Sequence, residues 1–188
     1  CRVSWQSGVH RRLRKGEGEM KEISYRKLTV EGFAKFGAYA NMINPSWPHL
    51  GAEPIEFYRD IVQSGIAQDN VVSFGVCRVT KRPFVMDVSE YHDLCCETVL
   101  PLDGDVLMHV APAVPEKEFP FDLAEVFLVP KGTIAILRPG VWHHAPYAFK
   151  CDCVNCLIAL PERTYVRDCK VYEFPASRHL KIVGDGIR

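Results

Sequence analysis

Short apolar runs separated by turn residues fill the chain from residue 71 onward, and this pattern limits the possible folds more than any other feature. Runs of this kind, rich in β-branched and aromatic residues, are typical of strands. We predict strands at 71–80, 84–88, 97–102, 105–111, 125–129, 133–138, 153–160 and 169–174. Gly and Pro turns separate several of them, as at 102–105 and 129–132. Short strands at this spacing predict an all-β sandwich or barrel.

Two helices are predicted before the strands. One covers 29–36, where Thr29 can act as the N-cap, and the other covers 54–64, where Pro54 occupies an N1-like position. The segments 44–51 and 111–120 are Pro-rich loops. A long loop on a compact barrel is a candidate lid or interface.

Composition excludes several classes of protein. The chain has 188 residues, is 47% apolar and carries 23 basic and 23 acidic side chains. An apolar fraction this high argues against disorder, and the neutral charge argues against a nucleic-acid partner. Apolar runs stay far below the ~20 residues that a membrane helix needs, so no membrane partner is expected.

The neutral charge is the sum of two unequal parts. Residues 1–19 hold five basic and two acidic side chains, whereas 20–188 hold 18 basic and 21 acidic ones. This basic tail lacks the apolar stretch of a secretory signal. A well-patterned strand follows Met20 at once, so we expect Met20 to be the natural start and the tail to be non-native or disordered. We expect residues 20–188 to form a single domain in the cytoplasm.

The eight cysteines favour free thiols. Cys1 belongs to the tail, which leaves an odd number in the domain. In the cluster formed by Cys151, Cys153 and Cys156, strand alternation places the third thiol on the opposite face from the other two. Three thiols so placed do not converge on one tetrahedral ion. We therefore expect buried free thiols in a reducing cytoplasm.

Two segments carry the residues that suggest chemistry. In the first, Glu90 and His92 are separated by one residue, four residues lead to Glu97, and six more lead to Gly104. This spacing resembles the first motif of the cupin superfamily, which reads His-x-His, four residues, Glu, six residues, Gly. Here Glu90 replaces the first His.

The second segment resembles the second cupin motif, which reads Gly, five residues, Pro-x-Gly-x-x-His. The chain has Gly132, five residues, Arg138-x-Gly140-x-x-His143, with Arg138 in place of Pro. Two spaced motifs in the right order imply a cupin-type double-stranded β-helix, or jelly-roll barrel, with short N-terminal helices.

The spacing brings a metal-ligating set of side chains together. One strand and its turn present His92 and Glu97 to the barrel interior, and a second hairpin presents His143 opposite them. Two imidazoles and a carboxylate leave coordination positions open for substrate. Glu90 shares a strand face with His92 and is a possible fourth ligand. Charged groups inside a barrel need partners, so we expect a divalent metal, Ni in the first place, with Mn, Fe or Zn also suited. The alternative is a polar pocket that binds substrate without metal.

Within the cupins, residues 22–174 are similar to ureidoglycolate lyases, with Trp142-His143-His144 as the most specific patch. The resemblance implies a cytoplasmic homodimer that splits ureidoglycolate into glyoxylate and urea. The chain departs from that family at Glu97, where its members carry Gln, and has Tyr147 where a general cupin often has Asn. A carboxylate at 97 strengthens metal binding and leaves the substrate less certain than the fold.

Under this resemblance each remaining polar residue has a candidate role. Breaking the C–N bond requires removal of the hydroxyl proton and protonation of the departing nitrogen. His144 is a candidate proton shuttle and Glu90 the alternative base. Arg78 and Arg138 are candidate clamps for the carboxylate of a small anionic substrate.

Other residues near these motifs have less specific interpretations. Lys81 and Arg82 are less favoured as clamps, since they also fit a solvated strand boundary. Trp142 and Tyr147 are expected to line the substrate pocket, although aromatic residues in a barrel often belong to the core. His109 fits the pocket and the core equally well.

Two other functions remain open on sequence alone. One is a metal cupin of another class, an isomerase or dioxygenase acting on a small carboxylate or sugar acid. The other is a non-catalytic module that binds a small metabolite, although no DNA-binding segment accompanies it.

Overall fold

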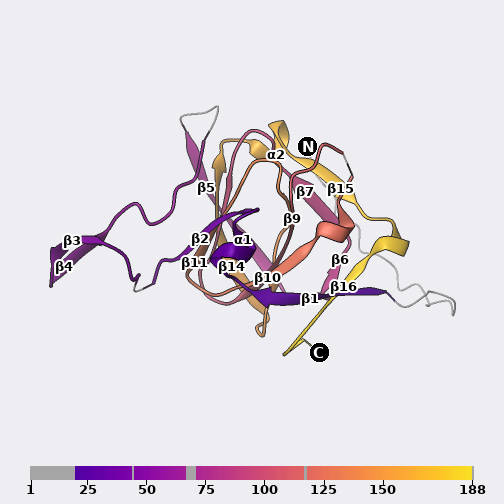
Figure 1. Ribbon diagram of the computed structural model, residues 1–188, viewed down its shortest axis with the longest axis horizontal. Helices are drawn as coiled ribbons and strands as arrows, with labels where there is room; N and C mark the ends of the chain where they lie inside the picture. The colour runs from indigo at the N-terminus through magenta and orange to yellow at the C-terminus, as the bar shows by residue number, and fades with distance from the viewer. Residues whose placement is uncertain (1–19, 44, 67–70, 117, 188) are drawn as a thin grey trace.

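Two β-sheets that face each other form the body of the molecule in the computed structural model (Figure 1). The structure describes residues 20–43, 45–66, 71–116 and 118–187. The basic segment 1–19, which we predict to be a non-native or disordered tail, lies outside the described residues. The predicted all-β fold is confirmed: strands make up most of the described elements, and they wrap into a jelly-roll barrel.

The larger sheet has nine strands in the described part of the chain, in the order β15-β7-β12-β9-β10-β1-β16-β6, with β13 paired to β9. Its strands are β1 (Lys21–Lys27), β6 (Val85–Met86), β7 (Val88–Tyr91), β9 (Val106–Ala111), β10 (Glu125–Val129), β12 (Trp142–His143), β13 (Tyr147–Ala148), β15 (Lys170–Glu173) and β16 (Leu180–Val183).

The smaller sheet has the order β2-β11-β8-β14-β5. Its strands are β2 (Gly37–Asn41), β5 (Val72–Thr80), β8 (Glu97–Pro101), β11 (Thr133–Leu137) and β14 (Cys153–Pro161). Its neighbouring strands are antiparallel. Gly37 is required where β2 meets β11, because a Cβ there would lie 1.7 Å from the carbonyl oxygen of Ile136.

The main core lies between the two sheets. Alternate residues of both sheets point inward, for example Val79 and Val99 from the smaller sheet and Met108 and Phe127 from the larger one. A second apolar cluster, centred on Trp142, Phe119 and Phe174, packs on the other side of the larger sheet. Burial of both clusters holds the strands around the barrel interior.

Helices are short. The first, α1 (Val30–Phe33), begins where the Thr29 hydroxyl accepts from the Gly32 amide at 3.0 Å, which agrees with the expected cap. The others are α2 (Thr164–Arg167) and two 3₁₀ turns, η1 (Phe121–Leu123) and η2 (Ala176–Arg178). Among the described residues, none of the helices combines the length and the apolar character that crossing a membrane requires.

The helix predicted at 54–64 is wrong. Residues on both sides of Pro54 form a hairpin of β3 (His49–Ala52) and β4 (Ile55–Tyr58), and Pro54 lies in its turn. The physical reason is the period of two in Ile55-Glu56-Phe57-Tyr58, which places apolar side chains on one face of a strand. Proline suits a turn as well as a helix start. The hairpin also shortens the predicted loop at 44–51.

Candidate metal and substrate site

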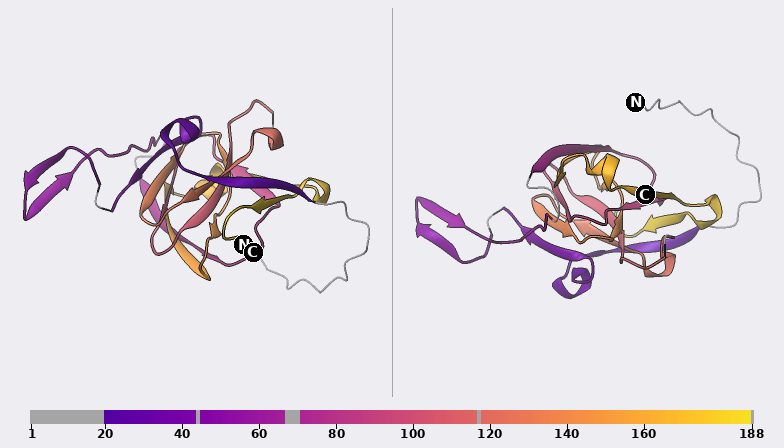
Figure 2. Two further views of the ribbon diagram at one scale, coloured as in Figure 1. Left: turned by 60° about the horizontal axis from the view of Figure 1, so that its bottom comes forward. Right: turned by 90° about the horizontal axis from the view of Figure 1, so that it is seen from above.

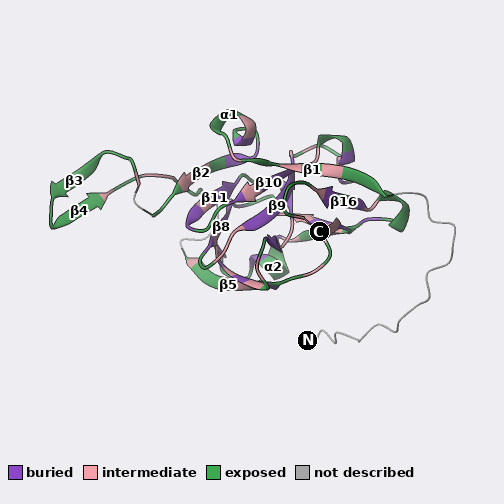
Figure 3. Ribbon diagram, turned by 90° about the horizontal axis from the view of Figure 1, so that it is seen from below, coloured by how far each residue is buried: buried purple, intermediate pink, exposed green. Residues whose placement is uncertain are grey.

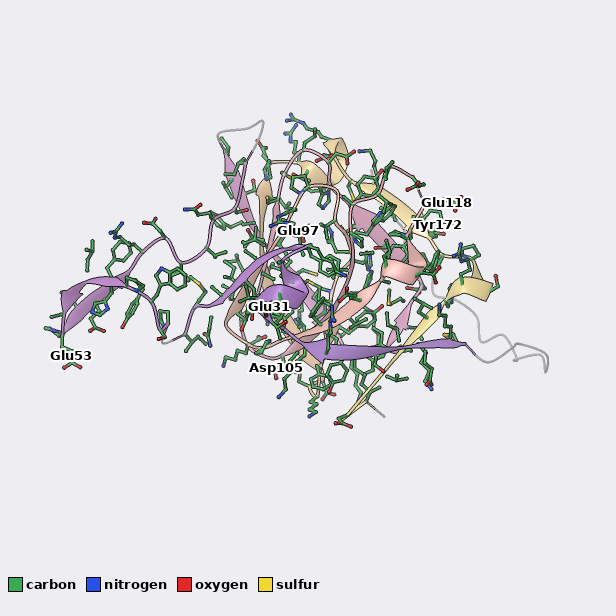
Figure 4. All side chains as sticks on the ribbon, in the orientation of Figure 1. Glu31, Glu53, Glu97, Asp105, Glu118 and Tyr172 are labelled. Carbon is green, nitrogen blue, oxygen red and sulfur yellow. The ribbon has the colours of Figure 1, made fainter. Side chains whose placement is uncertain are left out.

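Four polar side chains meet inside one end of the barrel, and three strands supply them. Glu90 lies on β7 directly opposite His143 of β12, His92 follows β7, and Glu97 begins β8. The ligand atoms of Glu90, His92 and His143 all lie within 4.8 Å of one another. Glu97, labelled in Figure 4, lies among the barrel strands and joins this group.

Glu97 connects the two histidines. Its Oε2 lies 3.0 Å from His92 Nε2 and 2.8 Å from His143 Nε2, and all three side chains are buried. The rings of the two histidines are 5.2 Å apart between centroids. The motif spacing therefore brings the three predicted ligands to a single point.

Backbone carbonyls hold both imidazole rings from behind. His92 Nδ1 donates to the Asp168 carbonyl at 2.5 Å, and His143 Nδ1 donates to the Val141 carbonyl at 2.8 Å. A carbonyl can only accept, so each Nδ1 carries the proton and each Nε2 faces the carboxylates. Gly140, at φ +79°, brings its own amide to 2.6 Å from the His92 carbonyl, which a residue with a Cβ could do only with strain.

The buried carboxylate and imidazoles polarise one another. Burial raises the pKa of Glu97, but the charge and hydrogen bonds of His143 and His92 outweigh it and lower the pKa to about 2. Burial lowers the pKa of His143, but the charge and hydrogen bond of Glu97 raise it to about 9. Glu97 is therefore a carboxylate at neutral pH.

This donor set fits a divalent metal. With both Nδ1 atoms donating to carbonyls, each Nε2 presents either a proton or a lone pair to Glu97. A lone pair facing a carboxylate is repulsive unless a cation lies between them. Two imidazoles and one or two carboxylates suit Ni, Mn, Fe or Zn. His92, Glu97 and His143 would hold the ion, and the Glu90 carboxylate would lie beside it.

Glu90 borders the cluster and has a thiol partner. Its Oε2 accepts a hydrogen bond from Cys169 Sγ at 3.2 Å. Burial, followed by the charge of Glu90, raises the pKa of Cys169 to about 12, so the thiol keeps its proton and remains a donor. The thiol thus orients the carboxylate that faces His143.

Two basic residues lie at the rim. His144 is half-buried, and burial lowers its pKa; the charge of Glu90 opposes this shift, while those of Arg82 and His143 add to it. Arg82 is half-buried and held on two sides: its Nη2 donates to the Ala145 carbonyl at 2.6 Å, and its Cζ lies 4.2 Å from the centre of the Tyr147 ring. The fixed guanidinium adds positive charge beside His144.

The structure does not bring the two predicted arginine clamps to the cluster. Cys77 and Val79 point into the barrel, so strand alternation turns Arg78 outward, where its Nε donates to Cys153 Sγ at 3.1 Å. Arg138 follows the inward-facing Leu137 and is exposed. Arg82, which the sequence favours less as a clamp, has a charge that acts on His144 beside the cluster.

Trp142 and Tyr147 belong to the second apolar cluster, and His109 contacts two of its rings. Trp142 is 2% exposed and packs against Tyr91 at 4.4 Å between centroids. Tyr147 is buried, donates to the Val85 carbonyl at 2.6 Å and supports Arg82 instead of lining an open pocket. His109 is buried, burial holds its pKa well below the ordinary range, and its Nε2 lies 3.3 Å from Ser89 Oγ.

The described cysteines are all free, in agreement with the expectation of thiols; Cys1 lies outside the described residues. Cys156 packs in the main core, while Cys153 faces outward beside Arg78. The two thiols therefore lie on opposite faces of β14, which leaves no thiolate metal site among them.

Sequence reasoning missed Asp168. Its carboxylate accepts from the amides of Asp93 and Leu94 at 3.0 and 2.8 Å, while its carbonyl holds His92. These contacts fix the turn that presents His92. No pattern in the sequence links residue 168 to residue 92, because the contact depends on β15 lying beside β7.

The chain shows structural similarity to Bacillus subtilis oxalate decarboxylase, from a study of its Mn(II) centres (TM-score 0.39, 14% identity, 55% of this chain and 24% of that one). It is similar to a dTDP sugar isomerase from Desulfovibrio desulfuricans G20 (TM-score 0.36, 12% identity, 80% and 87%). It is also similar to Lactobacillus farciminis oxalate decarboxylase in a formate complex (TM-score 0.31, 11% identity, 68% and 36%).

The chain spans about a quarter of the Bacillus protein and about a third of the Lactobacillus protein. No curated protein sequence matches it significantly. A family model described as ureidoglycolate lyase matches residues 20–181, which include both motifs and every residue of the cluster. The chain therefore belongs to the ureidoglycolate lyase family.

Proposed function

We propose that this protein cleaves the C–N bond of ureidoglycolate, or of a closely related small hydroxy acid, to give glyoxylate and urea. The match of residues 20–181 to the ureidoglycolate lyase family carries this proposal. The reaction removes the proton of the carbinol hydroxyl, forms the carbonyl of glyoxylate, and leaves the C–N electron pair on the urea nitrogen, which takes a proton.

The buried centre supports hydroxyl activation. A divalent cation held by His92, Glu97 and His143 would supply Lewis acidity toward the substrate hydroxyl. The backbone contacts behind both imidazoles keep their Nε2 atoms aimed at one point, so the donors are placed before substrate arrives.

Glu90 is the group we assign as general base. It is half-buried, lies opposite His143, and has one oxygen held by the Cys169 thiol. Its carboxylate therefore borders the position where the hydroxyl must lie. General base catalysis of this kind contributes about 10²–10⁴-fold.

His144 is the group we assign to protonate the urea nitrogen. Burial lowers its pKa below 6.5, so the imidazole is mostly neutral at pH 7 and would relay to the nitrogen the proton that Glu90 accepts; Glu90 and Arg82 are its charged neighbours. The proton that Glu90 removes can then reach the departing nitrogen through His144.

Arg82 is the group we assign to the substrate carboxylate, in place of Arg78 and Arg138. The Ala145 carbonyl and the Tyr147 ring hold the guanidinium, so little conformational freedom is lost on binding. A domain with a slight acidic excess attracts an anion only through such a local charge. We further propose that the reaction takes place in the cytoplasm, which the free described cysteines support.

Steady-state kinetics of purified, metal-supplemented protein on ureidoglycolate test these roles. We expect Glu90→Gln to lower kcat by about 10²-fold or more, because the amide cannot accept the proton. Lys81→Ala, a change at an exposed neighbouring cation, should leave kcat and KM nearly unchanged. Equal activity of Glu90→Gln and the natural protein would contradict the assignment.

A further inference from the structure

Two hydrogen-bonded side chains lie behind the larger sheet, on the face opposite the metal-ligating cluster. Ser89 lies on β7 one residue before Glu90, and His109 lies on β9. Side chains alternate along a strand, so Ser89 points to the opposite face of the sheet from Glu90. Leu107 and Ala111 of β9 belong to the second apolar cluster, so His109 between them faces that cluster. Both Ser89 and His109 are 0% exposed.

The surroundings of His109 are aromatic and closed to solvent. Its ring lies 6.4 Å between centroids from both Phe119 and Tyr147. Phe174 and Leu180 of the same cluster come from the C-terminal segment, drawn in yellow in Figure 2, which lies against the body of the molecule in both views. Figure 3 colours β9 itself as buried. The polar atoms of this imidazole therefore depend on partners within the protein.

The hydrogen bonds of Ser89 and His109 run in one direction. Ser89 Oγ lies 3.0 Å from the carbonyl oxygen of His143, and a carbonyl can only accept, so the hydroxyl donates its single proton there. His109 Nε2 lies 3.3 Å from the same Oγ, which has only lone pairs left to offer. His109 therefore carries a proton on Nε2 and donates it to Ser89. The chain of donors ends on the backbone of a predicted metal ligand.

The other ring nitrogen of His109 is unpaired. Burial lowers the pKa of His109 well below its usual value, so the ring is neutral and Nδ1 is a bare lone pair. Nδ1 is buried and has no hydrogen-bond partner in the described part of the chain. An unpaired buried acceptor lowers stability, and a phenylalanine would fill the same aromatic space without one. What a histidine offers at this position is its Nε2 donor.

The strand that receives this chain of donors is very short. β12 has two residues, and His143 pairs with Glu90 of β7 on one side and with Val110 of β9 on the other. So short a strand has few ladder hydrogen bonds to hold it. The Ser89 hydroxyl adds a bond at the residue whose imidazole contacts Glu97. Because Ser89 adjoins Glu90, the same bond fixes His143 relative to the proposed general base.

We propose that Ser89 and His109 are positioning residues, which hold β12 so that His143 Nε2 stays aimed at the metal position beside Glu97. His109 acts only through Ser89: its donated proton fixes the hydroxyl, and the hydroxyl fixes the His143 carbonyl. Outer partners that orient a ligand typically change metal affinity by about 10–100-fold when they are replaced. These roles rest on the metal site of the proposed function, but they do not depend on which substrate binds there.

Chelator competition with Mn(II) on the full chain measures the affinity of the centre without any substrate. Ser89→Ala should raise the Kd for Mn(II) about tenfold, because the His143 carbonyl loses its side-chain donor. His109→Phe should raise the Kd by about two- to tenfold, the value of one neutral hydrogen bond. His109→Gln, which keeps a side-chain N–H donor, should bind Mn(II) more tightly than His109→Phe. Thr133→Val removes a buried hydroxyl from β11 and should leave the Kd unchanged.

Two further measurements separate positioning from a general loss of structure. Adding His109→Phe to Ser89→Ala should change the Kd no further, because His109 acts only through the Ser89 hydroxyl. Urea unfolding of chelator-treated His109→Phe should give a free energy of unfolding no lower than that of the natural protein, because the unpaired Nδ1 is gone. Circular dichroism checks folding, and if Ser89→Ala misfolds, the comparison of His109→Phe with His109→Gln decides.

The outcomes distinguish these roles from the proposed function. An unchanged Kd in Ser89→Ala, additive effects of the two substitutions, or equal Kd values in His109→Phe and His109→Gln would overturn the proposal. So would a His109→Phe protein that loses stability together with metal affinity, or a natural protein that binds no Mn(II). If the Mn(II) affinities change as expected but the natural protein releases no glyoxylate from ureidoglycolate, the proposed function fails and the positioning roles stand.

Discussion

Replacing Glu97 with Gln tests the electrostatics of the buried centre. The carboxylate is 9% exposed and contacts both imidazoles at 2.8 and 3.0 Å. Lowering its pKa from 4.5 to about 2 corresponds to ~3 kcal/mol, at about 1.4 kcal/mol for each tenfold change in proton affinity. Breaking a buried ion pair by removing one partner costs about 3–5 kcal/mol, which agrees in size.

The assay is urea unfolding of chelator-treated protein, followed by tryptophan fluorescence. The chelator removes any cation, so the carboxylate–imidazole contact alone is measured. We expect Glu97→Gln to lower the free energy of unfolding by ~3 kcal/mol near pH 6. Glu31→Gln, a change at an exposed glutamate on α1, is the control and should change it by less than about 0.5 kcal/mol.

The difference in free energy of unfolding between Glu97→Gln and the natural protein should become smaller toward both low and high pH. Because folding lowers the pKa of Glu97, its contribution is present above 4.5 and is lost as pH falls toward 2. Because folding raises the pKa of His143, that contribution is present below 6.5 and is lost as pH rises through 9. The largest difference therefore lies between pH 4.5 and 6.5. Equal stability of the two proteins in that range would refute the reasoning.

Three further predictions concern the metal and the substrate. His143→Ala should abolish metal uptake and activity together, while Lys81→Ala should leave both nearly intact. Elemental analysis measures the metal content of each variant. A normal metal content in the His143 variant would contradict its role as a ligand. Asp168→Asn leaves one of two amides without a carboxylate acceptor and should weaken metal affinity by about 10–100-fold, measured by competition with a chelator. Arg82→Met should raise KM for ureidoglycolate by about tenfold or more, with a smaller effect on kcat, since a charged hydrogen bond is worth about 1.5–3 kcal/mol. An unchanged KM would exclude Arg82 as the group that binds the substrate carboxylate.

Local spacing was enough to predict the centre of the site. His92, Glu97 and His143 lie on strand ends and turns whose geometry depends on a few neighbouring residues, so their convergence follows from the two motifs. The strand at 125–129 was likewise predicted to the residue, because its apolar run ends at turns on both sides.

Longer-range features could not be predicted in the same way. Arg82 is held by Ala145 and Tyr147, more than sixty residues away, so its position depends on how β5 and β13 lie in the finished barrel. Asp168 contributes a backbone carbonyl, which any residue type could supply. Strand alternation within 71–80 could have excluded Arg78, since Cys77 and Val79 occupy the inward positions.

The hairpin shows how a local pattern can be misread. Pro54 fits both a helix start and a turn, and the period of two in 55–58 covers only four residues. Its pairing with 49–52 decides between them, and that pairing depends on side chains that precede the proline.

Product analysis on ureidoglycolate tests the central claim most directly. Purified protein supplied with Ni, Mn, Fe or Zn is incubated with ureidoglycolate, and glyoxylate, urea and ammonia are quantified. We expect glyoxylate and urea in equal amounts with no ammonia above background, since the C–N bond breaks without hydrolysis of the urea group. No glyoxylate release from fully metal-loaded protein would contradict it.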